Sequence, residues 1–294
     1  MKTRGISQNS PPSKTMPRRR WPSTKDLTAS VAEGLAALRG NLELPELRTI
    51  TPAAAAALAS HSGLLTLGMA SMWHGSVFKL GSEAAKCLSR HAGPLALPSL
   101  KRIDAETALA LSELKHHIYV LDLEEFPGGM AGVRLCERLA ENPSTSLSFS
   151  HLKRLQPECA KALAAFKGEL RLSVDEWSDD ALIALAAYQG RLGIDAKHIS
   201  DEVGRALGQR GPKSSLETPD YGGAIALTDA AAEALGIYQG GLCFGDGIEM
   251  SNEAAAHLVK RRSMNLFRTK LKPAIRKVFE SAGSWTGSTW TRNA

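Results

Sequence analysis

A segment of about 23 residues recurs along this chain, and it limits the available folds more than any other feature. Two copies align without a gap: NLELPELRTITPAAAAALASHSG at 41–63 and SLSFSHLKRLQPECAKALAAFKG at 146–168. Counted from the first strand-like leucine, both place apolar residues at 0, +2, +5 and +8, a Leu at +16, a ring at +19 and a Gly at +21. A constant period of this length is the signature of stacked repeats, each of which buries its apolar face against its neighbours.

The register of the repeat can be followed almost from end to end. It opens with a half-repeat that supplies Leu27, Leu35, Leu38 and Gly40, and it continues through about nine units. Three steps between units are longer than the others and indicate insertions. The residues expected to begin the successive strands are Leu42, Leu65, Leu95, Ile118, Leu147, Leu170, Leu192, Leu216 and Leu242.

Each unit contains two hydrophobic periods in succession. The Leu-x-Leu piece alternates and predicts a short strand with one buried face. The second piece spaces its apolar residues three and four apart, which predicts a helix. Residues suited to the helix N-cap precede this piece: Thr51, Ser82, Asp104, Ser178, Ser200, Thr228 and Ser251. Pro52 and Pro157 suit the first helical position, and glycines at 63, 93, 168, 190 and 240 suggest left-handed helix ends.

These signals predict an α/β fold that is a leucine-rich-repeat-like solenoid. Consecutive strand–helix units require right-handed crossovers and therefore a parallel sheet. Because a helix is wider than the spacing between strands, stacked units must curve, with the parallel sheet on the inner face and the α-helices on the outer face. Solenoids built from helix pairs need roughly 34–47 residues per unit, so the short period argues against them.

Residues 27–262 resemble the leucine-rich-repeat family, in an alanine-rich bacterial variant with a true helix in each unit. The resemblance implies a non-enzymatic protein-interaction scaffold and supplies no catalytic residues. The chain departs from the common pattern where most such repeats carry a buried Asn in the turn. Leucines stand there instead, at positions 47, 100, 123 and 152, so the turn geometry should differ.

Charge divides the chain into regions. Residues 1–25 hold seven Lys or Arg and no acid, and residues 260–294 hold nine against one Glu, whereas the stretch between them carries 20 bases and 29 acids. We expect residues 1–25 to be a disordered basic tail, residues 26–262 to form the repeat array, and residues 263–283 to cap it with a basic strand and helix around Pro273. Residues 284–294 should form a flexible tail.

Two surfaces are candidates for binding a protein partner. The first is the rim where the insertions 69–79, 124–132 and 217–224 lie; Trp73, Phe126 and Tyr221 either project from it as interaction anchors or fold back over the leucines beneath. The second is the inner sheet face, where only Tyr119 and Arg171 are of the types that dominate binding hot spots.

Binding of a polyanion, either a nucleic acid or an anionic surface, is the alternative function. It would use Arg18, Arg19 and Arg20 near the start and Lys260, Arg261 and Arg262 near the end. Such binding should weaken steeply with added salt. The alternative without a binding role is that these charges form a solvated tail and an exposed helix face.

The sequence gives no sign of catalysis, a cofactor or a metal site. His61, His91 and His116 fall in the slot that elsewhere holds Phe166 and Tyr188, so we interpret it as a packing position at the helix end. The four cysteines form no CxxC pair and are expected to be reduced, small and at least half-buried. No apolar run reaches the ~18 residues that span a bilayer and no secretory signal is visible, which predicts a cytoplasmic protein.

Overall fold

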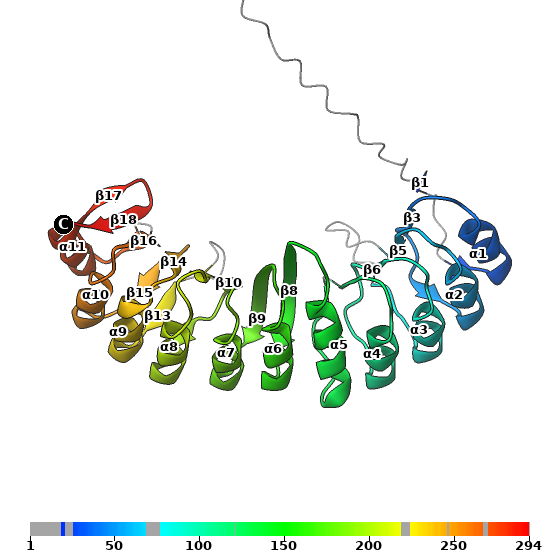
Figure 1. Ribbon diagram of the computed structural model, residues 1–294, viewed down its shortest axis with the longest axis horizontal. Coiled ribbons are helices and arrows are strands. Elements are labelled where there is room, and N and C mark those ends of the chain that lie inside the picture. Colours follow the sequence, from blue (N-terminus) through cyan, green and yellow to red (C-terminus); the bar gives the residue numbers. More distant parts are fainter. Residues whose placement is uncertain are drawn as a thin grey trace, which may run out of the picture.

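The computed structural model describes residues 19–20, 26–68, 77–120, 122–218, 224–245, 247–266 and 270–293. They form an α/β fold in which strands and helices alternate along an arc, with the helices on its outer side and the strands on its inner side (Figure 1). The helices of these residues are α1 (Ala29–Ala36), α2 (Pro52–Leu58), α3 (Ser82–Leu88), α4 (Ala105–Ser112), α5 (Met130–Ala140), α6 (Pro157–Leu163), α7 (Asp179–Leu185), α8 (Asp201–Gly208), α9 (Asp229–Ile237), α10 (Asn252–Leu258) and α11 (Pro273–Ala282).

Two main sheets line the inner side of the arc. The first has the order β1-β3-β5-β6-β7 and is built from β1 (Arg19–Arg20), β3 (Leu42–Leu44), β5 (Leu65–Leu67), β6 (Leu95–Leu97) and β7 (Ile118–Val120). The second has the order β17-β18-β16-β14-β12-β10-β9-β8. Its strands are β8 (Ser146–Arg154), β9 (Glu169–Glu176), β10 (Arg191–Ile194), β12 (Ser215–Thr218), β14 (Gly241–Phe244), β16 (Ser263–Leu266), β17 (Gly283–Thr286) and β18 (Thr289–Arg292).

Five shorter strands and two isolated bridges, Thr49 with Lys79 and Phe78 with Leu100, lie in the turns that lead to the helices. β2 (Asp26–Leu27) pairs with β4 (Thr49–Ile50), and β11 (His198–Ile199), β13 (Ile225–Leu227) and β15 (Ile248–Glu249) form a three-stranded sheet. All pairs in these small sheets are parallel. Antiparallel pairing occurs where β18 joins β16 and β17, so the second main sheet is mixed.

The strand register agrees with the sequence repeat residue by residue. In the first sheet Leu42 pairs with Leu65, Leu65 with Leu95, and Leu95 with Ile118. In the second sheet the pairs run from Leu147 through Leu170, Leu192 and Leu216 to Leu242. All nine predicted positions therefore lie in register on strands. The strands of the first sheet begin at these residues, whereas β8, β9, β10, β12 and β14 each begin one residue earlier. The ladder changes sheets between β7 and β8, where the step between units is 29 residues (118 to 147).

The helix starts follow the predicted capping chemistry. Thr51, Asp104, Ser178, Ser200, Thr228 and Ser251 each accept a hydrogen bond from the backbone N–H three residues ahead. Pro52 and Pro157 begin α2 and α6. The prediction for Ser82 is wrong by one position, because Gly81 is the N-cap and Ser82 is the first residue of α3.

The glycines after the helices serve a purpose other than the predicted one. The described glycines with positive φ are residues 40, 68, 129, 247 and 287, so the left-handed ends predicted at 63, 93, 168, 190 and 240 are wrong. These five glycines instead allow close approach between chain segments. A Cβ on Gly93 would overlap the carbonyl oxygen of Gly63 and lie 2.6 Å from that of Ser62, and one on Gly168 would lie 2.6 Å from the Thr145 oxygen.

The core runs the length of the arc between the sheets and the helices. Alanines at the inward helical positions, such as Ala55, Ala85 and Ala255, are fully buried, which allows the helices to lie close to the strands. The leucines at 47, 100, 123 and 152 are also buried. The turns of this chain are thus held by apolar burial at that position.

Both ends depart from the expected tails. β1 pairs in parallel with β3, through Arg19 opposite Leu42 and Arg20 opposite Glu43, so an irregular tail is wrong at these two residues. A strand and a helix, β16 and α11, lie in the range predicted for the C-terminal cap. The flexible tail predicted at 284–294 is wrong, because β17 and β18 form a hairpin there. Trp290 of this hairpin is buried edge-to-face on Phe279, with ring centroids 5.3 Å apart.

Candidate functional site

The inner face of the sheets presents one side chain between each pair of buried residues. The predicted inner-face positions are partly or fully exposed, as the strand alternation requires. They are Glu43, Thr66, Ala96, Tyr119, Ser148, Arg171, Gly193, Glu217 and Cys243. The two sequence candidates lie in different sheets: half-buried Tyr119 is on β7 in the first, and exposed Arg171 is on β9 in the second.

A network of ion pairs crosses the second sheet on this face. Arg191 contacts Glu217 through Nε–Oε1 at 2.6 Å and Nη2–Oε2 at 2.9 Å, and it contacts Glu169 at 3.4 Å. Glu169 also accepts a hydrogen bond from Arg171 at 2.6 Å. The hydrogen bonds to Glu217 raise the pKa of Arg191 above its ordinary value. The network fixes both guanidinium groups on the open face, which makes Arg191 and Glu217 part of a candidate surface that sequence reasoning did not single out.

A small hollow lies beside this network. Its volume is about 260 Å³, and Arg171, Gly193, Glu217 and His151 are among the residues that line it. Gly193 helps to form the hollow because it has no side chain on the face where its neighbours carry Arg171 and Glu217. The hollow can receive a side chain of a partner, with charged groups of both signs at its edge.

The rim candidates from the sequence do not gather into an exposed site. Phe126 has an exposed fraction of 0 % and packs edge-to-face on Phe149, with ring centroids 5.3 Å apart. It is a core residue, which corrects its candidacy as an interaction anchor and matches the alternative that the ring folds back. Trp73 and Tyr221 lie outside the described residues.

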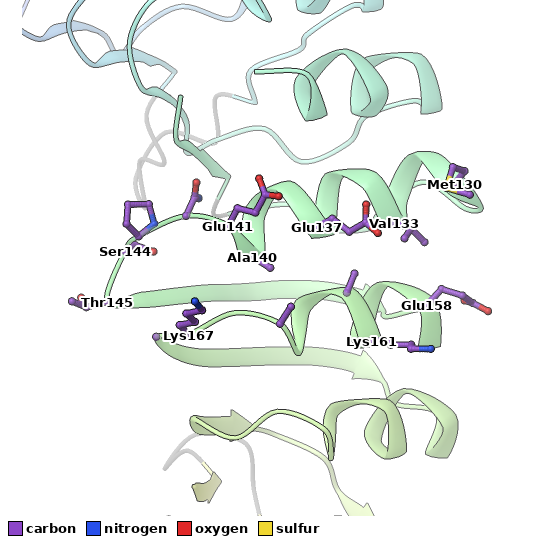
Figure 2. Close-up of a pocket in the computed structure, with 15 residues that line it drawn as sticks. Met130, Val133, Glu137, Ala140, Glu141, Ser144, Thr145, Glu158, Lys161 and Lys167 are labelled. Atoms are coloured by element: carbon purple, nitrogen blue, oxygen red, sulfur yellow. The ribbon is translucent and has the colours of Figure 1, made fainter. Parts of the chain in front are cut away.

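A groove between α5 and α6 is a surface that sequence reasoning missed. Its volume is about 1380 Å³, and its lining combines Val133, Ala140, Ala162 and Ala165 with three Glu and two Lys. Figure 2 shows Met130 at one end of the groove and Ser144 and Thr145 near the other. Met130 is 67 % exposed although it is apolar. The groove accompanies the break between the main sheets, so the long 118-to-147 step was its signal in the sequence.

The basic candidates near the C-terminus have different environments. Lys260 and Arg262 are exposed, but Arg261 has an exposed fraction of 6 %. Its guanidinium donates to the carbonyl oxygens of Leu235 at 2.8 Å, Gly240 at 2.7 Å and Tyr238. Arg261 therefore holds the chain together and cannot take part in surface binding of a polyanion. Arg18 lies outside the described residues, and only the backbone of Arg19 and Arg20 is described.

Arg261 belongs to a series of buried residues that close each unit. In the units of α2 to α4 and α6 to α10, the residue ten positions after the N-cap follows the end of the helix and is buried. Many of these side chains form hydrogen bonds to backbone carbonyls of neighbouring units. The members are His61, His91, Leu114, Phe166, Tyr188, Arg210, Tyr238 and Arg261. The packing interpretation is confirmed for His61 and His91. It is wrong for His116, which is exposed while Leu114 fills the slot.

The four cysteines form no disulfide, and two of them lie side by side. Cys136 of α5 and Cys159 of α6 are buried and close enough for their thiols to affect each other, while Cys87 and Cys243 are partly buried. Burial raises the pKa of the Cys136 thiol. Within the described ranges, no group of three His, Cys, Asp or Glu side chains is placed to hold a metal ion.

No protein-family model matches the chain, and no curated protein matches its sequence significantly. In the described part of the chain, every helix is too short or too polar to cross a membrane.

Proposed function

We propose that this chain is a non-enzymatic protein-interaction scaffold, a leucine-rich-repeat-like solenoid that binds a partner protein on its inner sheet face. The strand register at the repeat spacing supports the solenoid interpretation, and so does the curvature that puts sheets inside and helices outside. Concave surfaces of this kind are the extended binding surfaces of repeat proteins. No residue is assigned a catalytic role and no cofactor is required.

The observation that carries this proposal is the ion-pair network on the open face of the second sheet. Arg171, Arg191, Glu169 and Glu217 are held in fixed positions beside the hollow over Gly193. Exposed ion pairs contribute only about 0–1 kcal/mol to stability. Their ordered arrangement on a concave face is instead suited to electrostatic selection of a partner, because charge complementarity sets specificity and association rate.

Affinity purification from the native cells tests the proposal. The bait is the full chain, compared with the double variant Arg171→Gln/Arg191→Gln. Loss of the specific partners from the double variant supports the inner face as the binding surface, whereas identical partner profiles refute it. Lys86→Gln is the matched control, because Lys86 forms ion pairs of the same kind on the outer helices, to Glu83 at 2.7 Å.

Two further baits separate the other surfaces. Met130→Glu places a charge at one end of the groove between α5 and α6, so partners lost with this variant alone bind the groove. Trp73→Ala/Tyr221→Ala tests the rim that the sequence suggests. Partners that survive all of these variants would exclude the three surfaces and leave the scaffold proposal without a site.

Polyanion binding through the basic ends is the second candidate, and one surface of the C-terminal cap favours it. A hollow of about 730 Å³ is lined by Lys260 and Arg262 together with Asn265 and Thr289. Arg292 is also exposed and donates to the carbonyl oxygen of Lys260 at 2.8 Å. Three exposed bases therefore lie around the same end of the second sheet.

The test of this candidate uses the full chain, because removal of the C-terminal segment would expose the core that Trp290 covers. If the cap binds a nucleic acid, the logarithm of the association constant for a single-stranded oligonucleotide falls linearly with the logarithm of the salt concentration, by about 0.7 in slope per phosphate neutralised. Lys260→Gln/Arg262→Gln should lower that slope. No binding at low salt, or an unchanged slope in the variant, contradicts the candidate.

A further inference from the structure

Three basic side chains surround one carboxylate at the edge where the strands lead into the helices. Glu124 contacts Lys153 Nζ at 3.2 Å, Arg102 Nε at 3.3 Å and Lys101 Nζ at 3.8 Å. The Glu124 side chain is 18 % exposed, and the three bases are more exposed than it is. The hydrogen bond from Lys153 holds the pKa of Glu124 below its usual value, so this carboxylate stays ionised.

Stacking of successive units brings these residues together. Lys101 and Arg102 follow β6, Glu124 follows β7, and Lys153 lies on β8. Backbone hydrogen bonds join the three segments, from Glu124 N to Lys101 O at 2.8 Å and from Lys153 N to Glu124 O at 2.7 Å. The carboxylate therefore lies at the junction between the two main sheets, with bases on both sides of it.

A hollow of about 530 Å³ opens beside this cluster. Its lining includes Arg102, Glu124 and Lys153, and it continues along the loop 125–128 that leads into α5. This volume lies in the range of small-molecule sites, roughly 300–1,000 Å³. Glu125 is a second carboxylate at the hollow, so the two bases that line it, Arg102 and Lys153, balance its two acids. Lys101, which contacts Glu124 from outside the lining, gives the whole cluster one excess positive charge.

The start of α5 adds to the positive potential at the hollow. The N-cap is Gly129, which forms no side-chain capping bond, and the first turn of the helix has no acidic residue. Backbone N–H groups at a helix N-terminus favour anions, and glycines let an anion approach the backbone closely. This contribution is additional to the side-chain cluster, which is the main feature of the hollow.

We propose that this hollow is a binding site for a phosphate-type oxyanion, either free phosphate or the phosphate group of a small-molecule monoester. Arg102 and Lys153 provide charged donors, since an arginine fork and a lysine ammonium are the usual side-chain partners of phosphate. Glu124 positions both bases by ion pairing with them. The inference is independent of the scaffold proposal and of the basic cap, because it uses neither the inner face nor the C-terminal residues.

The proposal can be tested by nuclear magnetic resonance titration of the full chain at low ionic strength. The probes are inorganic phosphate and phenyl phosphate, with chloride added to match ionic strength. Saturable shifts should concentrate on the amides of 128–132 and on Lys153. Equal affinity for the two probes indicates a site for free phosphate, whereas tighter binding of phenyl phosphate indicates a monoester.

Variants then show whether the cluster carries the binding. Arg102→Gln/Lys153→Gln should weaken phosphate binding by about tenfold, because two charged donors are lost. Glu125→Gln should tighten it about two- to threefold by removing a repelling charge. Lys86→Gln is the matched control, because Lys86 is 52 % exposed and ion-paired and Lys153 is 51 % exposed and ion-paired.

Three results overturn the inference. They are the absence of saturable shifts up to about 10 mM of either probe, shifts spread evenly over all basic residues, and a loss of affinity in Lys86→Gln equal to that in the double variant. The circular dichroism spectrum of each variant establishes that it is folded, and these surface substitutions should change stability by less than about 1 kcal/mol.

Discussion

Replacement of Arg210 by leucine should destabilise the fold far more than its polar character suggests. Arg210 has an exposed fraction of 3 %. Its guanidinium donates to Tyr188 O at 2.9 Å, Gly190 O at 2.8 Å and Ser215 O at 3.1 Å, and it lies 5.9 Å from the centre of the Tyr188 ring. One side chain thus joins the end of α7 to the starts of β10 and β12.

The magnitude follows from those three bonds and an opposing cost. Hydrogen bonds from a charged donor each contribute about 1.5–3 kcal/mol, and the three carbonyls would lose this donor in Arg210→Leu. Burial of the positive charge destabilises the folded state and lowers the pKa of Arg210. The leucine variant is free of this destabilisation, which offsets part of the loss of the hydrogen bonds. Each buried carbonyl left without a donor costs about 1–3 kcal/mol, so after the opposing term we expect a net loss of about 2–5 kcal/mol.

Urea denaturation followed by circular dichroism measures this change, with Arg205→Leu on α8, the helix that ends just before Arg210, as the control. Arg205 is exposed, so its substitution should change the free energy of unfolding by less than about 0.5 kcal/mol. Amide hydrogen exchange should show faster opening around α7 and α8 than at the N-terminal end, because repeats contact mainly their neighbours. A loss below about 1 kcal/mol in Arg210→Leu would show that the carbonyls find other partners and would refute the reasoning.

Three other predictions can be checked by similar measurements. Gly93→Ala should lower the free energy of unfolding by more than about 2 kcal/mol, because the added Cβ would overlap the carbonyl of Ser62. Gly34→Ala should instead raise it by about 1 kcal/mol, because Gly34 is helical and nothing lies within 4 Å of the added Cβ. Burial lowers the pKa of His91, so the unfolded chain binds the proton more readily; stability should fall as the pH drops below about 6.5, and His91→Leu should reduce that slope in a pH series of denaturation curves. Trp290→Ala should lower the free energy of unfolding by about 3–5 kcal/mol, and an unchanged urea midpoint would place the C-terminal hairpin outside the cooperative fold.

The strand–helix architecture could be predicted from the sequence because the signals repeat. A single Leu-x-Leu segment is ambiguous, but the register from Leu42 to Leu242 is constrained by nine copies, and a one-residue slip would turn every leucine outward. Helix caps were predictable for the same reason, with an error of one residue at Ser82 where Gly81 takes the position.

The buried arginines could not be predicted from strand spacing alone. The slot at +19 from the strand start identified His61 and Phe166, but insertions in the turns shift that count in other units. Counting ten residues from the N-cap, from Ser200 and Ser251, would have placed Arg210 and Arg261 in it. An arginine in a series of rings and leucines then indicates a buried charge that bonds to carbonyls. It does not indicate a solvated patch.

The C-terminal hairpin was missed for a different reason. Its sequence, GSWTGSTWTRNA, lies outside the period and reads as polar. Its stability comes from Trp290, which packs on Phe279 and donates from Nε1 to the Phe279 carbonyl at 3.0 Å. Such a contact depends on the position of α11, which no local pattern in the tail reveals. The last repeat has an exposed core that some segment must cover, and the tryptophans were the signal that this segment is the tail.

Two candidate sites lie at the irregular step between Ile118 and Leu147, where the repeat is interrupted. A perfect repeat would make every inter-helix groove and every turn equivalent, so no position along the arc would be distinct. Here the sheet ladder ends at β7 and restarts at β8, and α5 is the longest helix among the described residues at 11 residues. The groove beside α6 opens on the outer side of this break, and the cluster around Glu124 lies at the turn edge of the same break. Insertion of six residues beyond the basic period thus gives one unit of the array a chemistry that its neighbours lack.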